Sequence, residues 1–129
     1  MVKIKSFVFS LCLAALLITG SIFYNLKLEK ASSGLLLTLN KITQSLENEN
    51  FTSAHKQTLL LEKNVKNLEI YFASLGNHQE IDNIEMTLAE MKSYIKDNQR
   101  HDALAKAQVL NFLFYHLPKN SRLKPENIF

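Results

Sequence analysis

The chain has little of the residues from which many enzyme sites and stapled folds are built. Its 129 residues include one cysteine, three glycines, two prolines and no tryptophan. Cys12 alone cannot form an intrachain disulfide, a Cys-x-x-Cys redox pair or a thiolate zinc site. Gly20, Gly34 and Gly76 lie too far apart for a glycine-rich loop that cradles phosphates. These absences exclude nucleotide-binding enzymes built on glycine-rich loops, dithiol redox sites and thiolate zinc sites.

Charge of one sign is also scarce. The sequence has 15 Lys and Arg against 12 Asp and Glu, which gives a net charge of +3. Lys3 and Lys5 supply two of these three charges, and the signs alternate along the rest of the chain. Nucleic-acid binding needs basic side chains clustered on one surface, so that phosphates release their counterions. We therefore expect no nucleic-acid partner.

The longest feature is an uncharged run that extends from residue 6 to residue 26. As a helix it would span roughly 31 Å, which matches the hydrocarbon core of a bilayer. Lys3 and Lys5 before the run, together with a short N-terminal tail, favour an N-terminus in the cytoplasm. The sequence predicts a tail and transmembrane anchor over 1–26 and an extracytoplasmic bundle with a short C-terminal tail over 27–129.

A cleaved signal peptide is the competing interpretation of the uncharged run. The run is long for a signal, and its small-residue triplet, Thr19-Gly20-Ser21, is followed by further apolar residues. We therefore favour a single-pass membrane anchor at the cell membrane.

Beyond the run, apolar residues recur at spacings of three and four, and no stretch alternates for long enough to indicate a strand. We expect an all-α fold, with an N-terminal transmembrane helix followed by an antiparallel bundle of three to four helices. Ser33-Gly34 is the expected joint between anchor and bundle, because glycine weakens a helix interior by about 1 kcal/mol relative to alanine. The expected apolar stripes are Leu35, Leu39, Ile42 and Leu46; Leu61, Val65, Leu68, Phe72 and Leu75; Ile81, Ile84, Leu88, Met91 and Ile95; and Ala103, Ala107, Leu110, Phe114 and Leu117.

Aromatic residues concentrate in the second and fourth expected helices. They are Tyr71, Phe72, Phe112, Phe114 and Tyr115. They could form an exposed patch for a partner or a second copy, or a wide buried face of a central helix. The buried face is the favoured interpretation. Pro118 is expected to end the fourth helix.

Polar residues cluster at the start of the third expected helix. His78, Asp82 and Glu85 are spaced by four and three, which places them along one helix face, and Glu80 lies among them. An antiparallel fourth helix would bring His116 towards them. Zinc, iron and manganese accept such ligands. The favoured alternative is structural, because acidic residues suit a helix N-terminus and histidine suits a C-terminus. We expect these five residues to bind a ligand or partner, with no metal, cofactor or catalytic role.

Three short segments resemble one protein family. They are the run His-Gln-Glu-Ile-Asp-Asn-Ile-Glu over 78–85, His-Leu-Pro over 116–118, and the ending Asn-Ile-Phe over 127–129. The chain is similar over nearly its whole length to the uncharacterised domain-of-unknown-function family 4363, whose members are short proteins of spore-forming Gram-positive bacteria. The resemblance implies an anchored helical protein, and it carries no activity, substrate or cofactor.

Together these features predict a non-enzymatic, membrane-anchored helical interaction module of the bacterial cell envelope. Its partner would be another envelope protein or a second copy of the chain. The alternative is a small-ligand or metal-binding bundle that uses His78, Asp82, Glu85 and His116.

Overall fold

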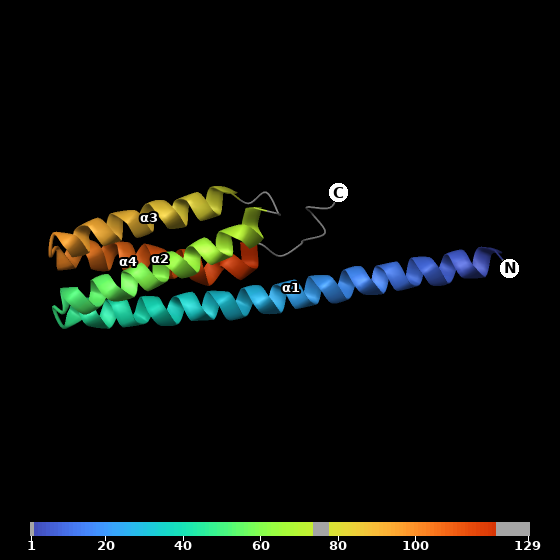
Figure 1. Ribbon diagram of the computed structural model, residues 1–129, viewed down its shortest axis with the longest axis horizontal. Coiled ribbons are helices and arrows are strands. Elements are labelled where there is room, and N and C mark those ends of the chain that lie inside the picture. Colours follow the sequence, from blue (N-terminus) through green and yellow to red (C-terminus); the bar gives the residue numbers. More distant parts are fainter. Residues whose placement is uncertain (1, 74–77, 121–129) are drawn as a thin grey trace.

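The computed structural model describes residues 2–73 and 78–120, and these residues form helices without any strand. The elements are α1 (Val2–Glu47), α2 (Phe51–Ala73), α3 (His78–Lys96) and α4 (Arg100–Asn120). The C-terminal half of α1 packs with the other three helices as an antiparallel bundle, and its N-terminal half projects beyond them (Figure 1). The predicted all-α class is therefore confirmed. The predicted C-terminal tail lies outside the described residues.

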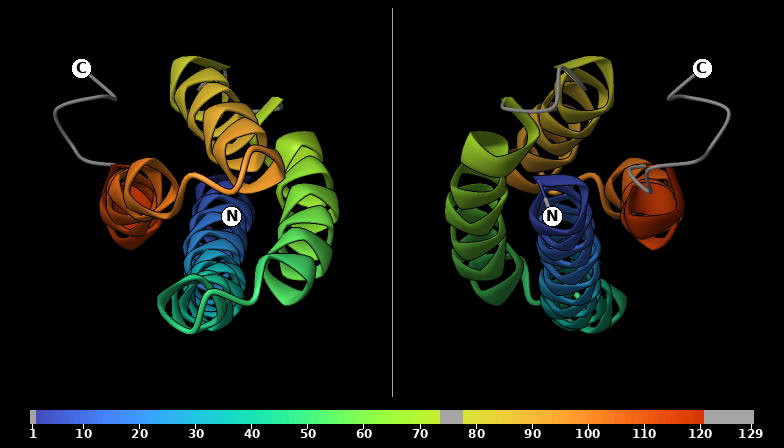
Figure 2. Two further views of the ribbon diagram at one scale, coloured as in Figure 1. Left: turned by 90° about the vertical axis from the view of Figure 1, so that its left-hand side faces the viewer. Right: turned by 90° about the vertical axis from the view of Figure 1, so that its right-hand side faces the viewer.

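Viewed end on, the four helices stand at the corners of a square (Figure 2). α1 packs against α2 and α4, and α3 packs against the same two helices, so α1 lies diagonally across the core from α3. This is the arrangement that short connections impose, because each helix must return beside the one before it.

Each helix turns one stripe of residues inward, at alternating steps of three and four. The stripes are Leu28, Ser32, Leu35, Leu39, Ile42 and Leu46; Ala54, Thr58, Leu61, Val65 and Leu68; Ile81, Ile84, Leu88, Met91 and Ile95; and Ala103, Ala107, Leu110, Phe114 and Leu117. The stripes expected for the first, third and fourth bundle helices are confirmed. In the second, Leu61, Val65 and Leu68 are confirmed, and the side chains of Phe72 and Leu75 lie outside the described residues. A seven-residue repeat of this kind is typical of knobs-into-holes packing with a left-handed supercoil.

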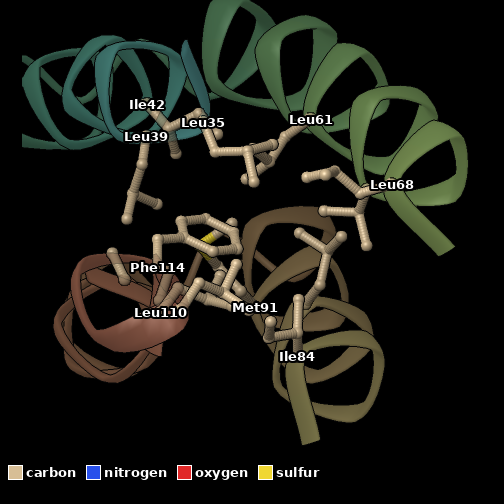
Figure 3. Packing of buried hydrophobic residues seen from close by; sticks show 14 of the residues in the cluster. Leu35, Leu39, Ile42, Leu61, Leu68, Ile84, Met91, Leu110 and Phe114 are labelled. Carbon is tan, nitrogen blue, oxygen red and sulfur yellow. The ribbon is translucent and has the colours of Figure 1, made fainter. Parts of the chain in front are cut away.

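The stripes meet in one core (Figure 3). Phe114 of α4 and Met91 of α3 point towards the leucine and isoleucine side chains of α1 and α2, and both are fully buried. Two polar residues, Ser32 and Thr58, interrupt the apolar stripes. The Thr58 hydroxyl donates a hydrogen bond of 2.7 Å to the carbonyl of Ala54 in its own helix, which satisfies it without a partner elsewhere.

The α1–α2 and α3–α4 connections have the same backbone geometry. Glu49 and Asn98 adopt left-handed conformations, with φ of 57° and 55°. The Glu49 N–H donates to the carbonyl of Leu46, and the Asn98 N–H donates to that of Ile95, at 3.1 Å in both cases. In each connection the following N–H, of Asn50 or Gln99, donates to the carbonyl five residues back. These two hydrogen bonds together form a Schellman motif, which ends the helix.

The two helical hairpins repeat one register. The positive-φ residue and the buried positions of the first hairpin, from Ser32 onward, recur 49 residues later in the second. Asn98 corresponds to Glu49, and Ala103 corresponds to Ala54. A separation of 49 is seven heptads, so both hairpins present their stripes in the same phase to a shared core. The sequence analysis did not detect this repeat, because it is carried by apolar character more than by identity.

α1 continues without interruption through Ser33-Gly34 from Val2 to Glu47, so the expected joint there is wrong. Ser32 before the glycine and Leu35 after it are both buried against neighbouring helices. This packing on both sides outweighs the weak helix preference of one glycine, since tertiary contacts supply most helical stability in proteins.

α4 continues two residues past Pro118, to Asn120, so the predicted stop at the proline is also wrong. Proline lacks the N–H that would bond to the carbonyl four residues back, which belongs to Phe114. The buried Ser32 hydroxyl of α1 donates a hydrogen bond of 2.6 Å to that carbonyl. The neighbouring helix thus replaces the missing donor and offsets part of the cost of the proline.

The N-terminal half of α1 has the length and hydropathy of a membrane-spanning helix, and none of its most apolar 18-residue window is buried inside the structure. Leu28 is the first residue of α1 that the bundle buries. The projecting half therefore has no protein cover within the described residues.

Candidate functional site

The predicted polar cluster lies along the first turns of α3. His78 is the first residue of the helix and is exposed, as is Asp82, whereas Glu80 and Glu85 are half-buried. Glu80 in the first turn suits the positive end of the helix dipole, as the structural interpretation of this cluster expects.

Glu85 faces α2, where it meets a second carboxyl group. Partial burial, and then the charges of Glu69 and Asp82, raise the pKa of Glu85, while the nearby Lys66 ammonium lowers it. The two carboxyl groups, of Glu69 and Glu85, can share a hydrogen bond only when one of them is protonated, which also raises the pKa of Glu85. The structure thus joins Asp82 and Glu85 with a residue that the sequence analysis did not include, Glu69. Only the three-dimensional pairing of α2 with α3 reveals this neighbour.

Two turns further along this interface, α2 and α3 are joined by opposite charges. Lys92 Nζ lies 3.2 Å from Glu62 Oε2. Both residues flank the buried stripes of their helices at the positions where coiled coils place interhelical ion pairs. The interface therefore holds one attractive pair and one pair of like charge.

His116 does not complete a metal site with the residues of α3. Its ring packs against Phe112 of its own helix, with centroids 4.3 Å apart, and meets Tyr115 edge-on at 5.3 Å. Among the described residues, no three His, Cys, Asp or Glu side chains group closely enough to hold a metal ion. The expected convergence of two histidines and two carboxylates is thus wrong, because Glu85 faces α2 while His116 packs among aromatic rings of α4.

Phe112, Tyr115 and His116 form what we name the α4 aromatic surface. Phe112 is 62% exposed and Tyr115 is 55% exposed, whereas Phe114 between them is fully buried. The expectation of one wide buried aromatic face is therefore wrong for Phe112 and Tyr115. Spacing alone could have shown that Phe112 and Tyr115 are exposed. Neither residue lies three or four positions from any member of the buried α4 stripe.

Ser32 was not among the residues expected from the sequence. A serine within an apolar stripe gives no sign of its hydrogen-bond partner. Here the partner is the Phe114 carbonyl, which lacks its helical donor because of Pro118, 86 positions after the serine. A buried polar residue opposite a proline-containing helix end is the signal that could have found it.

Comparison with known proteins gave one finding. Neither a search of curated proteins nor a search of solved structures gave a match. A family model, described as "Domain of unknown function (DUF4363)", matches residues 22–128 and so includes all four bundle helices and the end of the uncharged run. The chain therefore belongs to the DUF4363 family.

Proposed function

We propose that this chain is a non-enzymatic, single-pass membrane protein of the bacterial envelope, whose bundle binds a protein partner outside the cytoplasm. The observation that carries the proposal is the uncovered half of α1. Twelve large apolar side chains between Ile4 and Leu26 are exposed. Leaving each in water costs about 1.5–3 kcal/mol, or roughly 20 kcal/mol in total, more than the 5–15 kcal/mol that stabilises a typical domain. A bilayer removes this cost.

Charge supports the orientation in this proposal. Lys3 and Lys5 precede the uncharged run, and short basic flanks remain on the cytoplasmic side of a membrane. The bundle would then be the part of the protein that meets other molecules.

The α4 aromatic surface supports partner binding. Exposed aromatic side chains are enriched at the centres of protein interfaces, where they contribute much of the binding energy. Phe112 and Tyr115 stand outside the stripe that holds the bundle together. Their loss should weaken a partner complex without unfolding the protein.

Topology can be tested with the single cysteine. Cys12→Ser yields a cysteine-free chain, into which one cysteine is introduced at Lys5 or at exposed Asn40. Intact cells are treated with a maleimide that does not cross membranes. We expect labelling at position 40 and none at position 5 until the cells are opened. The opposite pattern, or release of the chain from membranes by alkaline carbonate, would refute the proposal.

Partner binding is tested by photo-crosslinking in the native membrane. A benzophenone amino acid replaces Phe112, and the matched control replaces Met86, which is 58% exposed on α3. We expect a discrete adduct from position 112 that the Tyr115→Ala variant weakens, and no such adduct from position 86. Equal adducts at both positions would contradict an interface on α4.

A further inference from the structure

A groove lies between α1 and α2 and begins at the last turn of the uncharged run. Its volume is about 450 Å³, within the range of small-ligand sites. Apolar side chains of Leu28, Ala31, Leu35 and Leu68 line it. Gly34 leaves its wall open, because no atom lies within 4 Å of where a β-carbon would stand. The apolar floor of the groove is thus formed by edges of core side chains that face the opening between the two helices.

A few polar groups edge this apolar surface. Tyr24 and Lys27 lie at the end nearest the run, and Asn64 and Asn67 lie along α2. The Tyr24 hydroxyl is buried and has no hydrogen-bond partner among the residues that the structure describes. A buried polar group without a partner costs about 1–3 kcal/mol, so an acceptor that reaches this hydroxyl would bind favourably. An apolar wall with a small number of polar groups is the composition of a ligand site.

The position of the groove along α1 indicates its occupant. Tyr24 lies in the last turn of the uncharged run and Lys27 follows its end, so a bilayer around the run places both at headgroup depth. A lysine there attracts lipid phosphates. The surface of α1 that leads to the groove, from Phe7 to Phe23, is exposed and apolar. Acyl chains would cover that surface, so lipid is the apolar ligand present at the highest local concentration.

From this continuity, and resting on the proposed membrane anchor, we infer that the groove binds one acyl chain of a phospholipid whose phosphate stays beside Lys27. From Tyr24 to Thr38 the helix rises about 21 Å, and half of a bilayer core is about 15 Å thick. The groove is thus long enough for most of an extended chain. The acyl chain covers the apolar wall, and a phosphate oxygen accepts the hydrogen bond that Tyr24 offers.

The test uses the full chain in nanodiscs of phosphatidylcholine and phosphatidylglycerol, with a trace of phosphatidylglycerol that carries a diazirine near the end of one acyl chain. After irradiation, mass spectrometry locates the adducts. Bulk lipid labels residues 6–26 and serves as an internal reference. α2 has no part in the uncharged run, so labelling of residues 64–68 reports an acyl chain in the groove.

Filling the groove should remove that signal. We expect Gly34→Phe to lower the labelling of residues 64–68 by about tenfold, equivalent to about 1.4 kcal/mol, and to leave labelling of 6–26 unchanged. Ser33→Phe is the matched control, since Ser33 lines the opposite groove between α1 and α4, and it should retain the signal. Lys27→Gln, at an exposed position outside the core, should lower it about fivefold.

The two proposals fail in different ways. A chain that does not elute with nanodiscs refutes the membrane anchor and the lipid site together. A chain that elutes with nanodiscs but carries no label on 64–68, or keeps that label in the Gly34→Phe and Lys27→Gln variants, refutes the lipid site alone.

Discussion

The hydrogen bond between Ser32 and the Phe114 carbonyl makes the sharpest prediction about stability. The serine is 4% exposed and donates at 2.6 Å to the carbonyl that Pro118 leaves without its helical partner. Ser32→Ala leaves this buried acceptor unpaired, which costs about 1–3 kcal/mol. Alanine recovers about 0.5 kcal/mol through its higher helix propensity. We expect a net loss of about 1–2 kcal/mol.

The assay is thermal unfolding of the full chain in nanodiscs, followed by circular dichroism. For a bundle of this size, 1 kcal/mol shifts Tm by about 4–8 °C, so Ser32→Ala should lower Tm by about 5–10 °C. Ser33→Ala is the control: it makes the same change one residue along, at an exposed position. It should raise Tm slightly, because only helix propensity changes.

A double-mutant cycle isolates the cause. Pro118→Ala supplies the missing N–H, so the Phe114 carbonyl regains its partner within α4. In that background Ser32→Ala should cost at least about 1 kcal/mol less than in the original chain. Equal Tm values for Ser32→Ala and Ser33→Ala, or a cost that Pro118→Ala leaves unchanged, would refute the reasoning.

Three further predictions concern single positions. The folded protein raises the pKa of Glu85, so it holds the carboxyl proton more tightly than the unfolded chain does. The free energy of unfolding should therefore fall as the pH rises from the ordinary glutamate pKa through the raised one. Glu85→Gln should abolish this dependence in unfolding curves and add about 0.3 kcal/mol of stability at pH 7. Glu49→Gly should stabilise the chain by about 1 kcal/mol in urea unfolding, and Asn98→Gly by less, because asparagine tolerates positive φ better than glutamate; equal effects would contradict the argument. Gly34→Ala should raise the free energy of unfolding by about 1 kcal/mol, because alanine favours a helix interior and its methyl group meets open space. Thermal unfolding measures this change, and a lower Tm would contradict a straight, unstrained helix at this position.

Most of the core could be read from spacing alone. Steps of three and four identify every buried residue of α3 in advance, from Ile81 to Ile95, because a helix repeats every 3.6 residues and a bundle buries one stripe of each. Four helices with short connections leave few alternatives to an antiparallel bundle. The spacing also placed Ala103 and Ala107 inside, although alanine alone is a weak indicator of burial.

Three of the failures share one cause, which is that neighbouring helices supply what local sequence lacks. Pro118 lies within α4 because a hydroxyl from α1 replaces its donor. Gly34 lies within α1 because packing holds the helix on both sides. Residue spacing placed Glu85 on a helix face, but it could not say that Glu69 would oppose it. Contacts between residues far apart in sequence are absent from any local pattern.

In the proposed membrane-anchored state, the unbroken course of α1 couples the orientation of the bundle to the bilayer. A span adjusts to a thinner or thicker membrane by tilting, and a helix without a joint carries that tilt outward. The α1–α2 turn at Glu49 lies about 35 Å beyond Leu26 along the helix. A change in tilt of about 10°, well within the range of spanning helices, moves that turn sideways by about 6 Å. Membrane thickness would thereby determine the height of the α4 aromatic surface above the membrane and the angle at which it meets a neighbouring protein.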